Sequence, residues 1–575
     1  MRYKAVITKV RVRYFKQFKD QEFDLSEHII LAGPNNSGKT TLLQAIAVWQ
    51  LAFKRWIAER GPGSGSKAKK RTGVPITRKD FTALPLREMN LLWTDTITGL
   101  KKEELENGQS QGHPRYLAIT LEGRLNDKSW RLTFDFRYQN TELAYIRASE
   151  EQYDKLPIKE NQLDVVHIPP FSGIGADETG HDRPYQDLLI GQGKAGDILR
   201  NLLLEVYKNS PKNNWKELCG HIEDIFGYRL LPPEYEGKPY ILCEYLCGIP
   251  KGKGRDGLAK LDIASAGSGF HQVLLLLAFF YARPSTVLLF DEPDAHLHVV
   301  LQKQIYDMLR SIAAKRHIQL IIATHAEVLI DNTSPDMILS FFKEPHCLVS
   351  DTDRDQVREA LKRLTATDVL LAERSQGVLY VEGQTDFDLL REWARILEHP
   401  MSKWFSENPF WHNNQGCHPR EARGHFFALR AIKDEIRGFL ILDGDNRSLP
   451  NHEVESDGLM VERWERYEVE NYLLHPDVLR RFVASRLGSL FAQKADDYLQ
   501  EQLPPAVYKN PLSPHDYLKA TPASKTLLPE FFRASQIDIT KQEYYMIAEQ
   551  MDESEIPPEI KNKLDKMAKI FKFGK

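Results

Sequence analysis

Two parts of this sequence carry residue types at spacings that suit phosphate chemistry. The first is "GPNNSGKTT", residues 33–41, in which glycines precede a lysine and two threonines. The second consists of "VLYVEGQTD", residues 378–386, and "LILDGD", residues 440–445, in which apolar runs are followed by acidic residues. The first pattern is typical of nucleotide-binding loops, and the second is typical of carboxylate sites for divalent metal ions. One chain therefore carries candidate sites for both nucleotide binding and metal-dependent cleavage of a phosphate ester.

The first part matches the phosphate-loop pattern Gly-x4-Gly-Lys-Thr, with an apolar run before it and a helical pattern after it. Backbone N–H groups of such a loop turn toward the phosphates, and the following helix N-terminus adds positive potential. Lys39 would contact the β- and γ-phosphate oxygens, and the Thr40 hydroxyl would bind magnesium. We expect the following residues to bind ATP: Gly33, Asn36, Gly38, Lys39, Thr40 and Thr41.

A second segment, "TVLLFDEPDAHLH" at residues 286–298, supplies the acids that such a loop needs. Its apolar run ends in Asp291 and Glu292. A buried parallel strand that ends in two acids places the first on the magnesium and the second beside the attacking water. We therefore predict that Asp291 binds magnesium and that Glu292 is the catalytic base of ATP hydrolysis.

Two further segments resemble parts of the ABC-type ATPases. "SAGSG", which begins at Ser265, resembles their signature motif, although the usual leucine and paired glycines are altered. "IIATHAEVL" places His325 at the end of the next apolar strand, where this class carries a switch histidine. In ABC-type enzymes the signature of one subunit closes over the ATP of the other. The resemblance therefore implies a dimer in which Ser265, Ser268 and Gly269 contact nucleotide.

The second part of the sequence predicts a metal site made of carboxylates. One apolar strand ends in Glu382, and another ends in Asp443-Gly444-Asp445. Residues two apart on a strand point the same way, so both aspartates would face one metal ion, while Gly444 lets the backbone pack closely. Oxygen ligands of this kind suit Mg²⁺ or Mn²⁺. The alternative is that these acids are solvated residues at loop ends.

A strand ending in Glu-Gly, followed by a strand ending in Asp-x-Asp, resembles the Toprim domain of topoisomerases, primases and certain nucleases. A third segment, "ERYEVENYLL", is similar to the glutamate-asparagine-tyrosine segment of some defence-associated Toprim nucleases. The resemblance implies that Glu382 is the general base or a metal-bound acid and that Asp443 and Asp445 bind the metal. Glu470 or Asp386 would be a ligand of a second metal ion.

These sites require α/β elements in at least two separate regions. The length of 575 residues suggests roughly two to four domains. We expect an ABC-type ATPase domain over residues 1–345, with a basic loop at 61–75 and a helical arm at about 195–227. A helical connector at 346–375, a Toprim α/β domain at 376–480 and a helical C-terminal region at 481–575 would follow. No long heptad repeat appears, which argues against SMC-type repair ATPases.

The composition predicts a cytoplasmic protein. Apolar residues make up 42% of the chain, and no apolar run approaches the ~20 residues that span a bilayer. The N-terminus lacks the pattern of a secretory signal, and the five scattered cysteines do not indicate a disulfide framework. With a net charge of -3, contacts with nucleic acid would depend on local basic patches.

An ABC-type ATPase followed by a Toprim domain resembles the OLD (overcoming lysogenization defect) family, which includes the nuclease subunit of Gabija and the ATPase–Toprim pair of PARIS. The resemblance implies an ATP-regulated, Mg²⁺- or Mn²⁺-dependent endonuclease of prokaryotic antiviral defence. It also implies a homodimer or higher homo-oligomer and allows for a second defence protein as partner. DNA is the expected substrate. Two alternatives remain open, a Toprim ribonuclease that cleaves tRNA and a non-nucleolytic ATP-driven clamp or scaffold in DNA repair.

Overall fold

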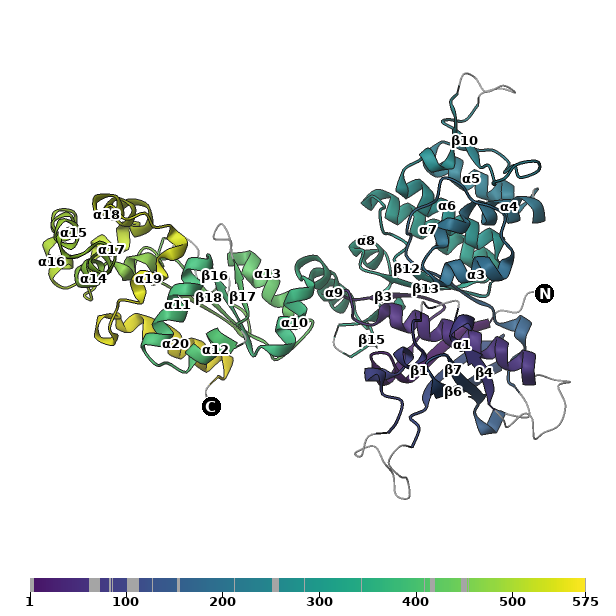
Figure 1. Cartoon of the computed structure of the whole chain (residues 1–575), viewed down its shortest axis with the longest axis horizontal. Coiled ribbons are helices and arrows are strands. Elements are labelled where there is room, and N and C mark those ends of the chain that lie inside the picture. The colour runs from purple at the N-terminus through teal and green to yellow at the C-terminus, as the bar shows by residue number, and fades with distance from the viewer. Residues whose placement is uncertain are drawn as a thin grey trace. The chain divides into compact units, whose positions relative to one another are not determined.

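The computed structural model divides the chain into two compact units, Met1–Arg358 and Glu359–Lys575, which we call the N-terminal and C-terminal units (Figure 1). No helix among the described residues is both long enough and apolar enough to cross a membrane. The structure describes residues 5–60, 73–81, 84, 86–100, 113–126, 128–152, 156–210, 212–250, 258–283, 285–342, 344–407, 409–413, 419–445, 452 and 455–573.

The N-terminal unit contains a six-stranded antiparallel sheet in the order β2-β1-β5-β6-β7-β4. Apolar and charged residues alternate along β1, so Val10 and Val12 are buried while Arg11 and Arg13 are exposed. Most of the basic loop expected at 61–75, residues 61–72, lies outside the described part, and Val74 and Pro75 belong to strand β4 instead. The strands are β1 Ala5–Phe15, β2 Phe18–Asp24, β4 Val74–Thr77, β5 Leu117–Leu125, β6 Lys128–Asn140 and β7 Leu143–Ala148.

A second sheet of the same unit has the order β15-β14-β3-β13-β12-β8, and only β15 runs antiparallel to its neighbour. The carboxyl ends of neighbouring parallel strands lie at one edge of a sheet, so β3, β13 and β12 bring together the residues that follow them. The strands are β3 His28–Ala32, β8 Val165–Ile168, β12 Val287–Asp291, β13 Gln319–Thr324, β14 Ile338–Ser340 and β15 His346–Cys347.

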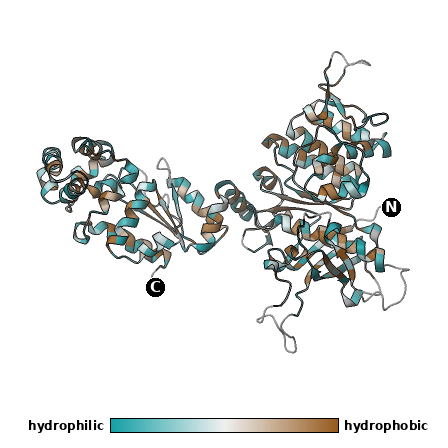
Figure 2. Ribbon diagram, viewed as in Figure 1, coloured by the Kyte–Doolittle hydropathy of each residue, from teal (hydrophilic) through white to brown (hydrophobic). Residues whose placement is uncertain are grey.

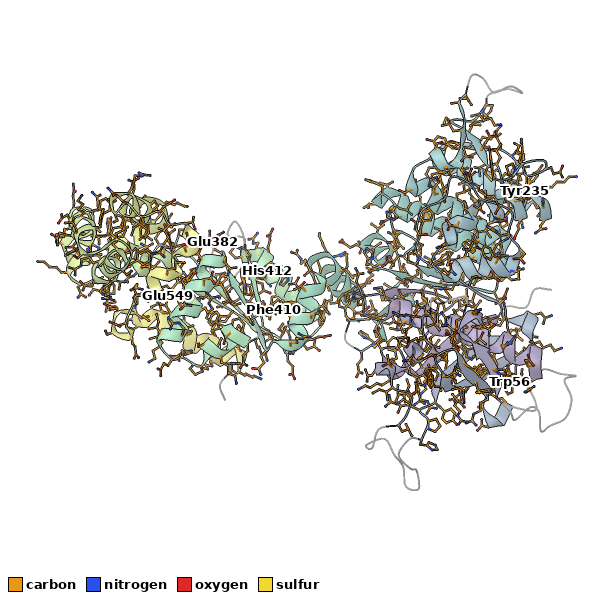
Figure 3. All side chains as sticks on the ribbon, viewed as in Figure 1. Trp56, Tyr235, Glu382, Phe410, His412 and Glu549 are labelled. Carbon is orange, nitrogen blue, oxygen red and sulfur yellow. The ribbon has the colours of Figure 1, made fainter. Side chains whose placement is uncertain are left out.

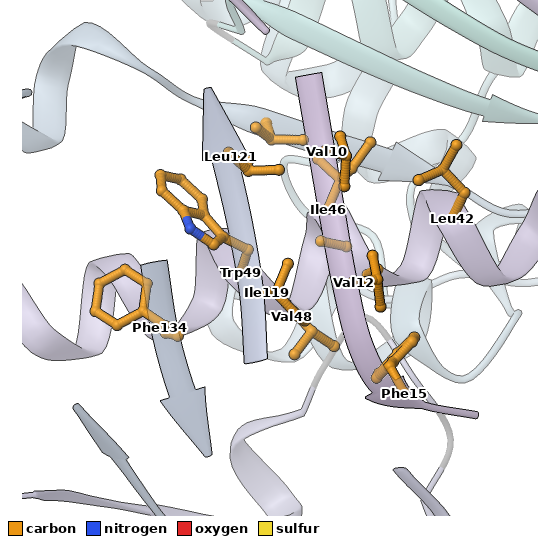
Figure 4. Packing of buried hydrophobic residues seen from close by; sticks show 14 of the residues in the cluster. Val10, Val12, Phe15, Leu42, Ile46, Val48, Trp49, Ile119, Leu121 and Phe134 are labelled. Carbon is orange, nitrogen blue, oxygen red and sulfur yellow. The ribbon is translucent and has the colours of Figure 1, made fainter. Parts of the chain in front are cut away.

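Helix α1, Lys39–Arg60, packs in one hydrophobic core with residues of both sheets. Its Trp49 is fully buried, stacks on Phe53 with ring centroids 5.2 Å apart, and donates its indole N–H to the backbone O of Leu132 at 3.0 Å. Figure 4 shows α1 residues, among them Ile46, against strands β1 and β5. Loss of a buried aromatic side chain costs about 3–5 kcal/mol, so this packing fixes the helix whose first residue is Lys39.

Helices cover the other face of the parallel sheet. The expected helical arm corresponds to α4 and α5, which both contact α6. A small sheet in the order β11-β10-β9 lies in the same unit. Hydrophobic residues gather along the strands and on the helix faces that pack together (Figure 2). The remaining elements are α3 Arg183–Gly191, α4 Leu199–Asn209, α5 Asn214–Phe226, α6 Ser268–Ala282, α7 Val299–Arg316, α8 Glu327–Asp331, β9 Arg229–Leu230, β10 Glu244–Leu246 and β11 Lys260–Asp262.

The C-terminal unit is built on a parallel sheet in the order β17-β16-β18-β19. Leu379 and Val381 pack into a core with α11, α12 and α20, whereas Val378 and Tyr380 pack on the opposite face with α10 and α13. The elements are α10 Ala366–Arg374, β16 Gly377–Val381, α11 Gln384–Ile396, α12 Met401–Glu407, β17 Trp411–Asn413, α13 Pro419–Arg430, β18 Arg437–Leu442, β19 Leu459–Arg463 and α20 Pro558–Phe571. Helix α9, Asp351–Arg363, crosses the boundary between the units.

The helical region expected at 481–575 shares its core with this sheet. Phe571 of α20 packs so closely against Gly377 of β16 that a Cβ atom there would collide with its ring. Helix α19 contacts α11, so the last helices complete the C-terminal unit. They are α14 Pro476–Leu487, α15 Ser489–Gln502, α16 Pro505–Lys509, α17 Asp516–Ala520, α18 Leu528–Ala534 and α19 Tyr545–Ala548.

Candidate active sites

The phosphate loop lies between β3 and α1 at the carboxyl edge of the parallel sheet. Lys39 is buried, and its Nζ donates to the backbone oxygens of Gly33 and Pro34, at 2.7 Å each. Burial lowers the pKa of Lys39 to about 8, although the charges of Glu292 and Asp291 oppose this shift. The ammonium group is therefore held in the loop, and phosphate oxygens would be stronger acceptors for it than these two carbonyls.

Gln17, which the sequence analysis missed, lies against this loop. Gly38 has a φ of 108°, and a Cβ atom there would lie 2.5 Å from Gln17 Nε2 and 2.7 Å from the ring of Phe18. The Thr41 hydroxyl lies 3.4 Å from Gln17 Oε1. The turn between β1 and β2 thus covers the loop and explains why residue 38 must be glycine. No motif in the sequence identifies Gln17.

Thr40 and Asp291 meet across a separation of 251 residues. The Thr40 Oγ1 donates to Asp291 Oδ1 at 3.0 Å. Burial raises the pKa of Asp291 to about 6, against the effect of the hydrogen bond from Thr40. A hydroxyl and a carboxylate at this distance are the oxygen ligands that Mg²⁺ prefers, so the donor set fits the predicted magnesium site.

Glu292 and His325 face each other at the ends of β12 and β13. Glu292 Oε1 lies 3.6 Å from His325 Nδ1. This interaction lowers the pKa of Glu292 and raises the pKa of His325. Glu292 has a φ of 50°, and its backbone N–H donates to the O of Ala323 at 2.9 Å. The structure thus brings the predicted base and the predicted switch residue together, with Glu292 kept in the ionised form that a base needs.

Three residues that the sequence analysis did not assign hold the segment after β12. The Thr324 hydroxyl donates to Asp294 Oδ1 at 2.6 Å, and Gln272 Nε2 donates to the backbone O of Pro293 at 2.8 Å. Asp294 and Gln272 are both buried. The available signal for Asp294 was its place as the third acid of "DEPD", three residues after Asp291.

The signature-like residues lie at the start of α6. Ser265 ends the short helix Ile263–Ser265, and its Oγ donates to the backbone O of Asp262 at 2.7 Å. Ser268 is the first residue of α6, and both serines are exposed. A Cβ atom at Gly269 would lie 3.5 Å from Leu297, so α6 begins close to the segment that follows Glu292.

We expect Glu292→Gln to bind ATP with little change and to lose hydrolysis by about 100-fold or more, because an amide can hold the attacking water but cannot accept its proton. Phosphate release and calorimetric ATP affinity, measured on one preparation, check this expectation. Glu549→Gln, a change at an exposed glutamate in the C-terminal unit, is the matched control (Figure 3). Wild-type hydrolysis by Glu292→Gln would exclude Glu292 as the base.

The second site gathers four acids, which we call the carboxylate cluster: Glu382, Asp386, Asp443 and Glu470. Glu382 follows β16, where Figure 3 labels it, and Asp443 follows the neighbouring strand β18. Asp386 lies in the first turn of α11, and Glu470 lies in the short helix Val469–Leu473. Burial raises the pKa of Asp443, and an interaction with Glu382 and the charge of Asp386 raise it further. Burial and the charges of Glu470 and Glu382 likewise raise the pKa of Asp386.

Two members of the carboxylate cluster also have partners within the protein. Asp386 Oδ2 accepts the backbone N–H of Gly383 at 3.2 Å, which caps α11, and Glu470 Oε1 pairs with Lys541 Nζ at 2.7 Å. In the part of the chain that the structure describes, no three His, Cys, Asp or Glu residues form a group that could hold a metal ion. A cation would therefore require these side chains to turn toward it, and its charge would relieve the repulsion among the four acids.

The prediction that Asp443 and Asp445 face one way along a strand is wrong. Strand β18 ends at Leu442, and the two aspartates lie in the turn that follows. Asp443 is half-buried, whereas Asp445 is exposed and donates its backbone N–H to the O of Tyr467 at 3.3 Å. The close approach expected at Gly444 is confirmed, because a Cβ atom there would collide with the backbone of Arg466.

The segment that carries Glu470 also anchors the C-terminal helices. Asn471 is fully buried, and its Nδ2 donates to the backbone oxygens of Leu518 at 3.1 Å and Thr521 at 2.9 Å. Lys541, which the sequence analysis also missed, comes from this helical region. The carboxylate cluster therefore includes contacts with a part of the chain expected to be separate from it.

Comparisons with known proteins identify an ATPase domain in the N-terminal unit. Residues 6–55 match the family described as "AAA ATPase domain", and residues 252–331 match "AAA domain, putative AbiEii toxin, Type IV TA system". These ranges contain the phosphate loop and the acidic strand, so ATP binding is expected there. Neither family model reaches the carboxylate cluster. No curated protein matches the chain.

Solved structures with some likeness to this chain include two SMC heads and the recombination mediator RecF. An SMC head bound to the C-terminal winged-helix domain of ScpA is 17% identical, with a TM-score of 0.35, covering 58% of this chain and 94% of that one. The SMC head domain from Thermotoga maritima is 13% identical, with a TM-score of 0.30 and coverage of 58% and 94%. RecF of the RecFOR pathway is 11% identical, with a TM-score of 0.30 and coverage of 59% and 97%. At these TM-scores the likeness carries no argument about function.

Proposed function

We propose that this chain is an ATP-regulated, divalent-metal-dependent endonuclease of prokaryotic antiviral defence, with DNA as its substrate. The observation that carries the proposal is the convergence of Glu382, Asp386, Asp443 and Glu470 at the carboxyl edge of a parallel sheet. Acids whose pKa is raised by burial and by neighbouring carboxylates, as the pKa values of Asp386 and Asp443 are, cluster at functional sites more often than elsewhere in proteins. The resemblance of these strands to a Toprim domain, and of the whole chain to the OLD family, supplies the nuclease and defence functions.

Each residue of the carboxylate cluster has a proposed part. Asp443 and Asp386 would bind a Mg²⁺ or Mn²⁺ ion, which supplies charge stabilisation at the cleaved phosphate when it is bound. Glu382 is exposed at the end of β16, so it can reach solvent and take the proton of the attacking water. Glu470 would bind a second ion once that ion replaces Lys541, with which Glu470 is paired in the structure. Asp445, which is exposed in the turn after β18, would be a further ligand of the metal ion.

The N-terminal unit would regulate this cleavage. Glu292 and His325 form the hydrolysis pair at the ATP site, and the exposed Ser265 and Ser268 are available to a second molecule. We propose that two chains clamp two ATP molecules between a phosphate loop and the partner's signature, as in ABC-type enzymes. Light scattering of Glu292→Gln should show a dimer or a larger assembly that forms with ATP. An unchanged mass with and without ATP would argue against the clamp.

Incubation of the purified protein with Mn²⁺ or Mg²⁺ and either plasmid or total tRNA tests the proposed activity. We expect plasmid cleavage that EDTA abolishes. The "VENYLL" segment, which resembles that of PARIS-like Toprim proteins, favours tRNA as the second candidate, and cleavage of tRNA alone would establish it in place of DNA. Cleavage of neither, with intact ATP hydrolysis, would favour a DNA-repair clamp or scaffold.

A further inference from the structure

Asp262, which ends β11, joins the signature-like residues to the rest of the N-terminal unit. Its Oδ1 accepts the backbone N–H of Ala264 at 2.8 Å, and its backbone O accepts the Ser265 hydroxyl at 2.7 Å. The same carboxylate accepts two hydrogen bonds from Arg200 of α4, Nη2 to Oδ1 at 2.7 Å and Nη1 to Oδ2 at 2.9 Å. One aspartate therefore links the turn that carries Ser265 to a guanidinium group on another helix.

Arg200 is itself held in place. Its side chain is 2% exposed, and its Nη2 also donates to the backbone O of Ala176 at 3.0 Å. The backbone N–H groups of Arg200 and Asn201 donate to the buried carboxylate of Glu178, at 2.8 Å and 2.7 Å. A guanidinium group that binds both oxygens of a carboxylate fixes its orientation as well as its distance. The position of Asp262 is therefore set by α4.

A second helix holds the same turn. Nε2 of His271, a buried residue of α6, donates to the backbone O of Ile263 at 2.6 Å, and the backbone N–H of Ile263 donates to the O of Cys243 at 3.0 Å. Ser265 and Ser268, which we call the signature-like serines, are exposed in contrast. They thus face solvent from a backbone that buried groups keep fixed, so they would bind a ligand without first becoming ordered.

We propose that Arg200 is a positioning residue for ATP hydrolysis: through Asp262 it keeps the signature-like serines where they bind the ATP of a second copy of the chain. The inference rests on the proposed clamp of two chains. Displacement of a contacting group by about 1 Å can lower a rate by about 100-fold, so a loosened turn would slow hydrolysis. The chain's own phosphate loop would stay intact, because Lys39 bonds to carbonyls of the loop and Thr40 bonds to Asp291.

Asp262→Asn breaks the paired hydrogen bonds and keeps the size of the side chain. The amide oxygen can still accept the N–H of Ala264, but the amide NH2 group meets a guanidinium group that has only donors. We expect kcat for ATP hydrolysis to fall about 10-fold or more, with calorimetric ATP affinity within about 2-fold of the wild type, because the lost contact acts only in the assembled clamp. Wild-type kcat in folded Asp262→Asn would overturn the proposal. An equal loss of ATP affinity would also overturn it, because the substitution would then act on the chain's own ATP site.

Two further variants localise the effect. Arg200→Lys keeps the positive charge but replaces the planar fork by a single ammonium group, so kcat should also fall. Glu244→Gln is the matched control, because Glu244 lies opposite Asp262 on the neighbouring strand β10 and pairs with Lys260. Its amide can still accept a hydrogen bond from Lys260, so kcat should not change. A kcat as low in Glu244→Gln as in Asp262→Asn would assign the effect to the small sheet and overturn the role of Arg200.

Light scattering with ATP separates this inference from the clamp on which it rests. Glu292→Gln should assemble with ATP, and the double variant Glu292→Gln/Asp262→Asn should need about 10-fold more protein to assemble, because its serines are no longer held in place. Equal assembly of the two variants would leave the clamp standing and overturn the positioning role of Arg200. No assembly of Glu292→Gln itself would refute the clamp and this inference with it. Circular dichroism of each variant confirms that the comparison is made on folded protein.

Discussion

Lys39→Ala is expected to abolish ATP binding. The variant loses the cation that would meet the β- and γ-phosphates, and it also loses the two hydrogen bonds that join Lys39 Nζ to Gly33 and Pro34 in the loop. A hydrogen bond from a charged group contributes about 1.5–3 kcal/mol. The loss of order in the loop would weaken ATP binding further. We therefore expect the affinity to fall by about 100-fold or more, beyond what calorimetry detects at ordinary protein concentrations.

Lys54→Ala is the matched control for this experiment. Lys54 lies on the same helix, α1, and its Nζ pairs with Asp164 at 2.7 Å on the surface. Exposed pairs of this kind contribute about 0–1 kcal/mol, so ATP affinity should not change. If Lys39→Ala bound ATP with wild-type affinity, residues 33–41 would not be a phosphate-binding loop. An equal loss of ATP affinity in both variants would indicate that helix α1 is damaged, rather than that one phosphate-binding side chain is missing.

Asp443→Ala is expected to lower metal-dependent cleavage by at least ~100-fold, as the loss of one strong electrostatic contributor commonly does. Asp443 interacts with Glu382, Asp386 and Glu470, so its removal takes one carboxylate from the centre of the carboxylate cluster. Asp445→Ala is also expected to lower metal-dependent cleavage. ATP hydrolysis should stay near the wild-type rate, because the variant leaves Lys39 and Glu292 in place.

Thermal unfolding gives a second measure of the same substitution. Mn²⁺ should raise the Tm of the wild-type protein, because a ligand that binds only the folded state stabilises it. The shift should be smaller in Asp443→Ala, which keeps the metal site at Thr40 and Asp291, and unchanged in Asp457→Ala, in which an exposed aspartate paired with Arg430 is changed. Persistent cleavage by Asp443→Ala, or an undiminished Mn²⁺ shift, would exclude Asp443 as a metal ligand.

Part of the geometry of the predicted ATP site could be read from the sequence, because several of its residues follow buried parallel strands. The motif order and strand ends predict that Lys39, Thr40, Asp291 and Glu292 lie at one sheet edge, and a hydrogen bond joins two of them, Thr40 and Asp291. Gln17 could not be predicted, because a turn between two strands carries no motif that shows which surface it covers.

The carboxylate cluster was harder to predict because tertiary packing decides much of it. The Asp-Gly pair at residues 443–444 is itself a turn signal, so the strand ends before Asp443 and its alternation does not continue to Asp445. Lys541 reaches Glu470 from a position 71 residues further along the chain, and no local pattern predicts such a contact. The packing of the last helices on β16 and β18 could not be read from the helical periodicity of that region alone.

One paired measurement tests whether the ATP site regulates a carboxylate nuclease. Nucleic-acid cleavage and phosphate release are followed on the same preparations, with and without ATP, for the wild-type protein, Lys39→Ala and Asp443→Ala. We expect the wild-type cleavage rate to change with ATP, the Lys39→Ala rate to be independent of ATP, and Asp443→Ala to hydrolyse ATP without cleaving. A wild-type cleavage rate that is the same with and without ATP, or loss of both activities in folded Asp443→Ala, would contradict regulation of a separate nuclease site by ATP.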